Sequence, residues 1–190
     1  AQRQFQLAET HYRKAIALEP EMASAYLGLG VNFASQRDFP NALEQFQRAI
    51  ALAPKLPSAY HSLGQTYAWM GDLPKAIEAY QTAIRLEPNH HAPYYELGVA
   101  YIQLKDYPNA ITALENVVKL QPRHKSAHYN LAQAYAKIGK LNQAEAETRT
   151  FEELHQVDEE TKPHRRTLEG DPEDVKARYA IAQVYAKHGW

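Results

Sequence analysis

Histidine is the residue type in this sequence best suited to metal chemistry, and four of the nine histidines lie in close pairs. His90 is followed directly by His91, and His124 precedes His128 by four residues, a spacing that puts two imidazoles on one helical turn. A zinc site needs three or four ligands and neighbours that orient them. Both pairs instead fall where successive repeats join, as described below, and polar residues are usual there. We therefore expect no metal site.

Catalytic chemistry has fewer candidates still. The chain has no cysteine, so it offers neither a thiol nucleophile nor a thiolate ligand. It contains no glycine-rich phosphate loop and no serine in a nucleophile elbow. The carboxylates of Glu152-Glu153 and of residues 158–160, followed by Arg165-Arg166, are typical of a solvated helix face with its charge partners. We expect a non-enzymatic chain without a cofactor.

The charge composition argues against nucleic acid and membrane surfaces as partners. The 21 basic residues balance the 22 acidic ones, so no excess of positive charge predicts binding to phosphates. No apolar run approaches the length of a membrane span, and Arg3 and Gln4 interrupt any apolar stretch at the N-terminus. Because the chain starts inside a repeat and without an initiator methionine, we expect it to be a fragment of a longer protein.

The repeat is visible in four prolines, each 34 residues after the last: Pro20, Pro54, Pro88 and Pro122. The prolines close the similar strings AIALEP, AIALAP, AIRLEP and VVKLQP. A proline blocks continuation of a helix and biases the residue before it towards an extended conformation. Each string therefore predicts the end of a helix.

Two helices are expected within each period, because apolar residues recur at offsets of three, four and seven residues. The first helices carry Tyr26, Leu29, Gly30 and Phe33; Tyr60, Leu63, Gly64 and Tyr67; and Tyr94, Leu97, Gly98 and Tyr101. The second helices carry Ala42, Phe46 and Ala49; Ala76, Tyr80 and Ala83; and Ala110, Leu114 and Val117. The glycine of each first helix lets the neighbouring helix approach closely.

Taken together, this pattern resembles the tetratricopeptide repeat family. The resemblance implies an all-α fold in which helix hairpins stack into a right-handed α-α superhelix with a concave side. Three complete repeats are expected at residues 23–56, 57–90 and 91–124. Residues 1–22 supply the second helix of a truncated first repeat.

The fifth repeat, residues 125–171, departs from the pattern. It begins at Lys125, His128 replaces its first aromatic residue, and no proline closes it on schedule. The second helix is expected to run from about Lys140 well beyond the usual length until Lys162-Pro163 breaks it.

A second break is expected at Gly170-Asp171-Pro172. Pro172 follows Pro122 by 50 residues, which predicts an insertion of about 16 residues into the fifth repeat. Residues 172–190 then supply the first helix of a further truncated repeat, spanning Val175–Gly189.

A candidate binding surface follows from the resemblance. If each repeat is counted from residues 23, 57, 91, 125 and 175, the resemblance implies that positions 2, 5, 9, 12 and 13 face the concave groove. The candidate groove residues are Leu27, Val31, His61, Gln65, Trp69, Tyr95, Val99, Ile102, Tyr129, Gln133 and Tyr179. Aromatic side chains in such a groove suit protein binding. Trp69 is the strongest candidate, since a scaffold has little reason to carry tryptophan there. The alternative is that the position-5 side chains merely fill gaps between first helices.

One binding mode of the family is not expected here. Some relatives hold the C-terminal carboxylate of large chaperones in a clamp of lysine, asparagine and arginine side chains. At the corresponding positions of this chain only Asn130 matches. The clamp is therefore ruled out.

Two functional hypotheses remain. The first is an adaptor that binds an extended or helical peptide, or a protein segment, in the aromatic and apolar groove. The second is a scaffold that oligomerises through its terminal repeats and its long helix. The second hypothesis rests on the apolar stripe Phe151–Val157, which has no second helix of a sixth repeat to cover it.

Overall fold

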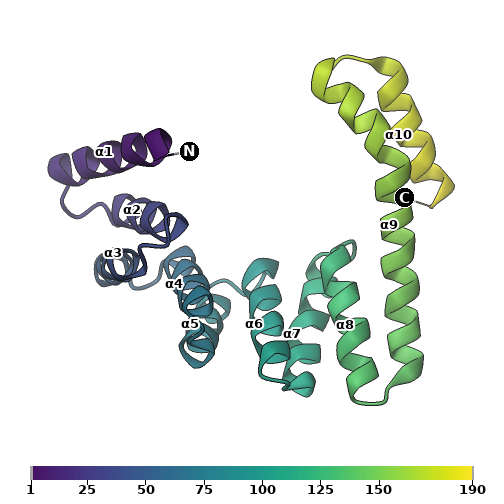
Figure 1. Ribbon diagram of the computed structural model, residues 1–190, viewed down its shortest axis with the longest axis horizontal. Coiled ribbons are helices and arrows are strands. Elements are labelled where there is room, and N and C mark those ends of the chain that lie inside the picture. Colours follow the sequence, from purple (N-terminus) through teal and green to yellow (C-terminus); the bar gives the residue numbers. More distant parts are fainter. Residues whose placement is uncertain (1, 190) are drawn as a thin grey trace. The chain divides into compact units, whose positions relative to one another are not determined.

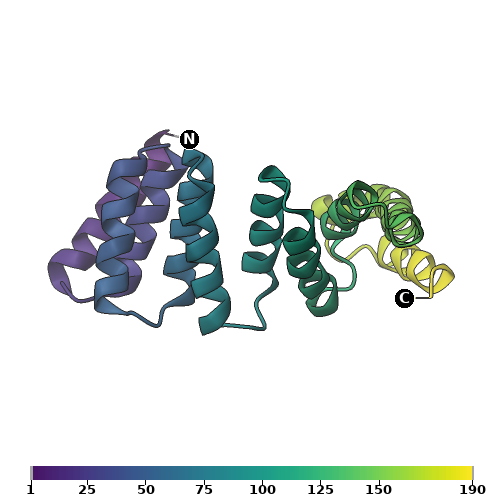
Figure 2. The same cartoon turned by 90° about the horizontal axis from the view of Figure 1, so that it is seen from below.

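The computed structural model describes residues 2–189, and all secondary structure in that range is helical (Figures 1 and 2). The helices are α1 (Gln2–Leu18), α2 (Ala23–Ser35), α3 (Phe39–Leu52), α4 (Pro57–Met70), α5 (Leu73–Leu86), α6 (His91–Gln103), α7 (Tyr107–Leu120), α8 (Lys125–Lys137), α9 (Leu141–Gly170) and α10 (Val175–Lys187). None of them combines the length and hydropathy that a membrane span requires. The predicted all-α class is confirmed. The outermost residues of segments 1–22 and 172–190 lie outside the described range.

The chain forms two compact units, Ala1–Leu120 and Gln121–Trp190, here called unit 1 and unit 2. In unit 1 the hairpins α2–α3, α4–α5 and α6–α7 follow one another, and α1 packs against α2. Close contact within each hairpin depends on the glycine predicted for it. A β-carbon on Gly30 would lie 2.6 Å from the Phe46 ring, and one on Gly98 would lie 2.6 Å from Cγ of Leu114.

The turn inside each hairpin uses two local devices. A left-handed residue precedes the second helix: Arg37 has φ 61° and Gly71 has φ 82°. An aspartate then caps that helix, because Asp38 accepts a hydrogen bond from the backbone N–H of Asn41 at 3.4 Å, and Asp72 does so from Lys75 at 3.3 Å. The Asp-x-Pro sequence therefore begins each second helix.

The joints between repeats contain a hydrogen bond that the sequence pattern does not reveal. The hydroxyl of Tyr26 donates to the carbonyl oxygen of Pro20 at 3.2 Å, and that of Tyr60 donates to Pro54 at 3.1 Å. Each tyrosine is the fourth residue of its repeat, so its aromatic ring packs while its hydroxyl satisfies a carbonyl at the preceding helix end.

Unit 2 keeps this joint with other side chains. His128 bonds the carbonyl oxygen of Pro122 through Nε2 at 2.9 Å, and Arg178 bonds the carbonyl oxygen of Pro172. His128 thus replaces an aromatic residue without loss of the hydrogen bond.

First helices lie on the inner side of unit 1. α4 contacts both α2 and α6, whereas α3, α5 and α7 make no such contacts with one another in the described part of the unit. A stack that is closer on one side curves towards that side. The surface shared by α2, α4 and α6 is therefore the concave one, and we call it the inner face.

Unit 2 contains the hairpin α8–α9 and the helix α10, which packs against α9. α9 is 30 residues long against 14 in each of α3, α5 and α7, a difference of 16. The sequence predicts an insertion of about 16 residues in this repeat. The helix ends at Gly170, as the second predicted break requires.

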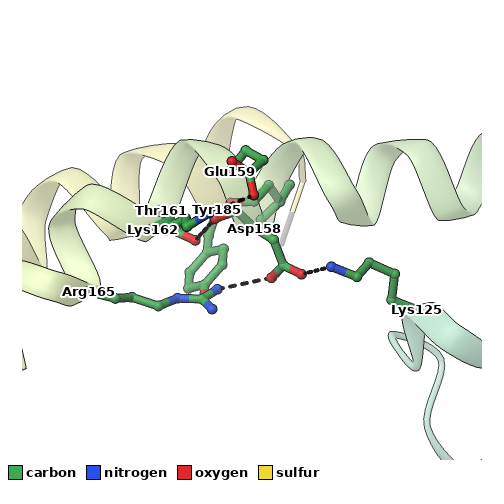
Figure 3. A network of polar contacts seen from close by, with 8 residues as sticks. Lys125, Asp158, Glu159, Thr161, Lys162, Arg165 and Tyr185 are labelled. Carbon is green, nitrogen blue, oxygen red and sulfur yellow. Dashed lines mark hydrogen bonds and ion pairs between the residues drawn. The ribbon is translucent and has the colours of Figure 1, made fainter.

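The predicted break at Lys162-Pro163 is wrong, because α9 continues through it. Side chains on both sides of the proline tie the helix to its neighbours (Figure 3). Asp158 accepts from Lys125 of α8 and from Arg165 at 3.4 Å, and Arg165 also reaches the hydroxyl of Tyr185 on α10 at 3.5 Å. These contacts fasten α9 to α8 before the proline and to α10 after it.

The expectation that the Phe151–Val157 stripe stays uncovered is also wrong. Leu154 is buried and Val157 is 1% exposed. Further along the same helix, Thr161 is fully buried, and its hydroxyl donates a hydrogen bond to the carbonyl oxygen of Val157 at 2.8 Å. α9 packs against α8 and also against α10, a helix of the next repeat.

Candidate partner-binding surface

Eight of the eleven predicted groove residues lie on α2, α4 and α6, the helices that form the inner face. They come from three consecutive first helices and are Leu27, Val31, His61, Gln65, Trp69, Tyr95, Val99 and Ile102. Their accessibility differs widely. Trp69 is 56% exposed and Val31 is 43% exposed, whereas the other six are partly buried. Trp69 therefore offers the largest accessible aromatic surface of the set.

A cavity of about 210 Å³ opens beside Trp69. It is lined by residues of α4, α5 and α6, among them Gln65, Trp69, Tyr80, Glu96, Val99 and Gln103. We call it the Trp69 cavity. Three predicted groove residues meet in it, and Tyr80 and Glu96 are among the lining residues that were not predicted as site residues.

Glu96 gives the Trp69 cavity a carboxylate. Burial raises the pKa of Glu96, and a hydrogen bond from the Gln65 side chain acts in the opposite direction. No Lys or Arg in the described part of the chain forms an ion pair with it. It is also the single Asp, Glu, Lys or Arg within α2, α4 and α6. The inner face therefore has one charged side chain along these helices, and it lies in the cavity.

Tyr80 adds a hydroxyl to the same cavity. The residue is 0% exposed, and its hydroxyl has no hydrogen-bond partner among the described residues. Burial, together with the nearby Glu96 carboxylate, raises the pKa of Tyr80 well above its ordinary value, so the phenol stays protonated. Sequence reasoning assigned Tyr80 to the scaffold, and its ring does pack there, against Gly64.

The His61 side chain is partly buried. Its ring is 6.0 Å from that of Tyr80 and 6.0 Å from that of His90. Burial, with a smaller effect of His90, lowers the pKa of His61 to about 4. Its Nε2 has no hydrogen-bond partner in residues 2–189. The side chain is therefore neutral at physiological pH.

The other three predicted groove residues belong to unit 2. Tyr129 and Gln133 line a cavity of about 610 Å³ between α8 and α9, and Tyr129 packs on Phe151 with ring centroids 5.3 Å apart. Tyr179 is 64% exposed on α10. α10 contacts α9 but has no contact with α8 among the described residues, so the fold does not bring Tyr179 beside Tyr129.

His124 and His128 serve local structure. Nδ1 of His124 accepts a hydrogen bond from the backbone N–H of Ala127 and caps α8. His128 uses both ring nitrogens, one on Glu147 and the other on Pro122. No group of three or more His, Asp or Glu side chains within residues 2–189 is arranged to hold a metal ion.

The charged run on α9 has partners of the kind expected for a helix face. Lys125 and Arg165 lower the pKa of Asp158, the Lys125 hydrogen bond most of all. Glu160 accepts from Lys187 of α10 at 2.9 Å, and this contact is the largest cause of its lowered pKa. Both carboxylates join α9 to neighbouring helices.

Comparison with known proteins extends this picture. Profiles described as tetratricopeptide repeats match residues 1–57, 57–90, 79–112 and 98–139. No curated protein sequence matches significantly.

Solved structures share the fold at low sequence identity. A crystal structure of MamA is 24% identical with a TM-score of 0.75, covering 82% of this chain and 91% of MamA. YrrB, described as a TPR protein with an unusual peptide-binding site, is 22% identical with a TM-score of 0.69, covering 93% and 82%. PilF of Pseudomonas aeruginosa is 17% identical with a TM-score of 0.74, covering 98% and 83%.

Proposed function

Because the chain belongs to the tetratricopeptide repeat family, we propose that it is a non-catalytic interaction module that binds a peptide or protein segment on the inner face of unit 1. The proposed contact residues are the eight listed above on α2, α4 and α6. YrrB has the same fold, and its description as a peptide-binding protein supports a peptide as the ligand class.

The observation that carries the proposal is the exposed indole of Trp69 beside its cavity. Tryptophan buries a large apolar area with few rotatable bonds, which makes it a frequent anchor in protein interfaces. The indole is 56% exposed in the free chain, so it is available to a ligand. Val99, which lines the same cavity, provides aliphatic surface beside it.

The test uses peptides selected from a random display library on the immobilised chain. Their dissociation constants are then measured by calorimetry for the wild type, for Trp69→Ala and for Leu18→Ala. Leu18 is a matched control, because it is an exposed apolar residue on α1, away from the inner face. We expect Trp69→Ala to weaken binding about thirtyfold or more, since hot-spot truncations remove at least about 2 kcal/mol. Leu18→Ala should leave binding unchanged. Selected peptides that bind Trp69→Ala as tightly as wild type would refute the proposal.

Self-association remains a second candidate function, and the cavity between α8 and α9 favours it. Besides Tyr129, that cavity exposes Leu141, which is 62% exposed, and small residues such as Ala136. An apolar groove of this kind suits a helix of a second copy. Light scattering over a concentration series decides: a mass that stays monomeric at the highest concentration removes this candidate. If the mass rises, Leu141→Lys should reverse the rise.

A further inference from the structure

The surroundings of Glu96 disfavour the charged form of its carboxyl group. It is partly buried between helices, its pKa is raised by that burial, and Gln65 is its hydrogen-bond partner in place of a cation. A charge removed from water is destabilising unless it is paired. Its equivalents in the other repeats are Gly28, Ser62 and Asn130, so this position of the repeat does not need a carboxylate to fold.

The Tyr80 hydroxyl is a second polar group in unfavourable surroundings. It is buried without a partner, although the equivalent residues in the neighbouring repeats are Phe46 and Leu114, which fill the same place without an oxygen. Two polar groups that the scaffold does not require therefore line one cavity. A buried polar group without a partner in its own chain can be satisfied by an ordered water or by a bound ligand, and ligand pockets carry a few such groups among apolar walls.

The remaining walls suit a side chain with an apolar stem and a positive end. The Trp69 indole offers a flat face that attracts cations. The side-chain amides of Gln65 and Gln103 also line the cavity. The volume of about 210 Å³ lies below the ~300 Å³ at which pockets accommodate whole drug-sized ligands, so a single side chain is the better fit.

We propose that the Trp69 cavity binds one basic side chain, lysine or arginine, of the peptide held on the inner face. The Glu96 carboxylate receives the ammonium or guanidinium group, the stem lies against Trp69, and the Tyr80 oxygen accepts one N–H. Charge complementarity selects this occupant, since Glu96 is the single Asp, Glu, Lys or Arg of α2, α4 and α6. The inference rests on the proposed function and adds the chemistry of one ligand residue to it.

The experiment uses four mixtures of N-acetylated, C-amidated dodecapeptides. One central position is fixed as Lys, Arg, Leu or Glu, and the other positions are randomised over uncharged residues. Binding of each mixture is measured for the wild type, Glu96→Gln, Glu96→Lys, Trp69→Ala and the control Glu44→Gln, which changes an exposed carboxylate on α3. Circular dichroism checks that every variant remains helical.

The wild type should prefer the Lys or Arg mixture to the Leu mixture about tenfold, and the Lys and Arg arms tell which cation fits better. Glu96→Gln should abolish that preference while binding of the Leu mixture persists. Glu96→Lys should transfer the preference to the Glu mixture. The control Glu44→Gln should leave the binding of all four mixtures unchanged. Equal binding of all four mixtures by the wild type, with Trp69→Ala still harmful, overturns the basic-residue inference and leaves the proposed function standing. If Trp69→Ala binds every mixture as tightly as the wild type does, the proposed function itself is overturned.

Discussion

Replacement of Tyr80 by phenylalanine removes one oxygen atom from the interior of unit 1. The ring is 0% exposed and its hydroxyl has no partner among the described residues. Phe46 occupies the equivalent place one repeat earlier and is also 0% exposed. A β-carbon on Gly30 would lie 2.6 Å from the Phe46 ring, and one on Gly64 would lie 2.6 Å from the Tyr80 ring. The two sites have the same close packing, so a phenyl ring fits where Tyr80 now stands.

The size of the effect follows from that geometry. A buried polar group without a hydrogen bond costs about 1–3 kcal/mol of stability. Tyr80→Phe should therefore raise the free energy of unfolding by about 1 kcal/mol or more, because it removes this cost and keeps the apolar contacts. The reciprocal change, Phe46→Tyr, adds an unpaired hydroxyl at the matched site and should lower the free energy of unfolding by a similar amount.

Urea denaturation followed by circular dichroism measures both effects, with the slope m checked so that only changes in stability are compared. The reasoning fails if Tyr80→Phe is no more stable than wild type, since solvent entering the Trp69 cavity would then already satisfy the hydroxyl. It also fails if Phe46→Tyr is harmless. If the hydroxyl serves a ligand, the stabilised Tyr80→Phe variant should at the same time bind the Lys and Arg peptide mixtures more weakly than wild type does.

Three further changes test other features. Arg37→Gly should raise the free energy of unfolding by about 1 kcal/mol in a urea titration, because Arg37 has φ 61°, a conformation that costs a residue with a β-carbon about that much; equal or lower stability contradicts this. Gly98→Ala should lower stability by about 1–3 kcal/mol through the clash with Leu114, whereas Gly170→Ala, with open space around it, should not. The pKa of His61 is lowered to about 4 in the folded chain, so the folded state keeps this imidazole neutral. Between about pH 4 and pH 6.5 the unfolded chain therefore binds one more proton than the folded chain does. Stability should consequently fall from about pH 6.5 to about pH 4, and His61→Leu should reduce the fall by about 1 kcal/mol after allowance for solvent screening; an unchanged pH profile contradicts the assignment.

Local sequence signals were enough to predict most of the helices. The proline spacing and the Asp-x-Pro strings are short-range features, so they give the ends of α2 to α7 without knowledge of the neighbours. Pro163 shows the limit of such signals. A proline inside a helical pattern predicts a break, but α9 is held on both sides by Lys125 and Tyr185, which are distant in sequence.

The binding surface shows the same limit. Trp69 was predicted as exposed because its place in the repeat and its residue type suffice for that. Glu96 and Tyr80 belong to different repeats and face one cavity only after α5 and α6 have packed. Glu96 could have been noticed, because it is the one charged residue in three otherwise uncharged first helices. No sequence feature would have revealed that the Tyr80 hydroxyl lacks a partner.

The length of α9 has a consequence for the geometry of the solenoid. A repeat array is a screw, and each regular repeat advances the next one by a constant step. The 16 additional residues lengthen one helix by about 24 Å, or nearly four and a half helical turns. The additional residues move the next helix out of the position that a regular repeat would give it. As a result, α10 contacts α9 but not α8 in the described chain. Within unit 2, a ligand bound along α8 therefore has no continuous surface to α10.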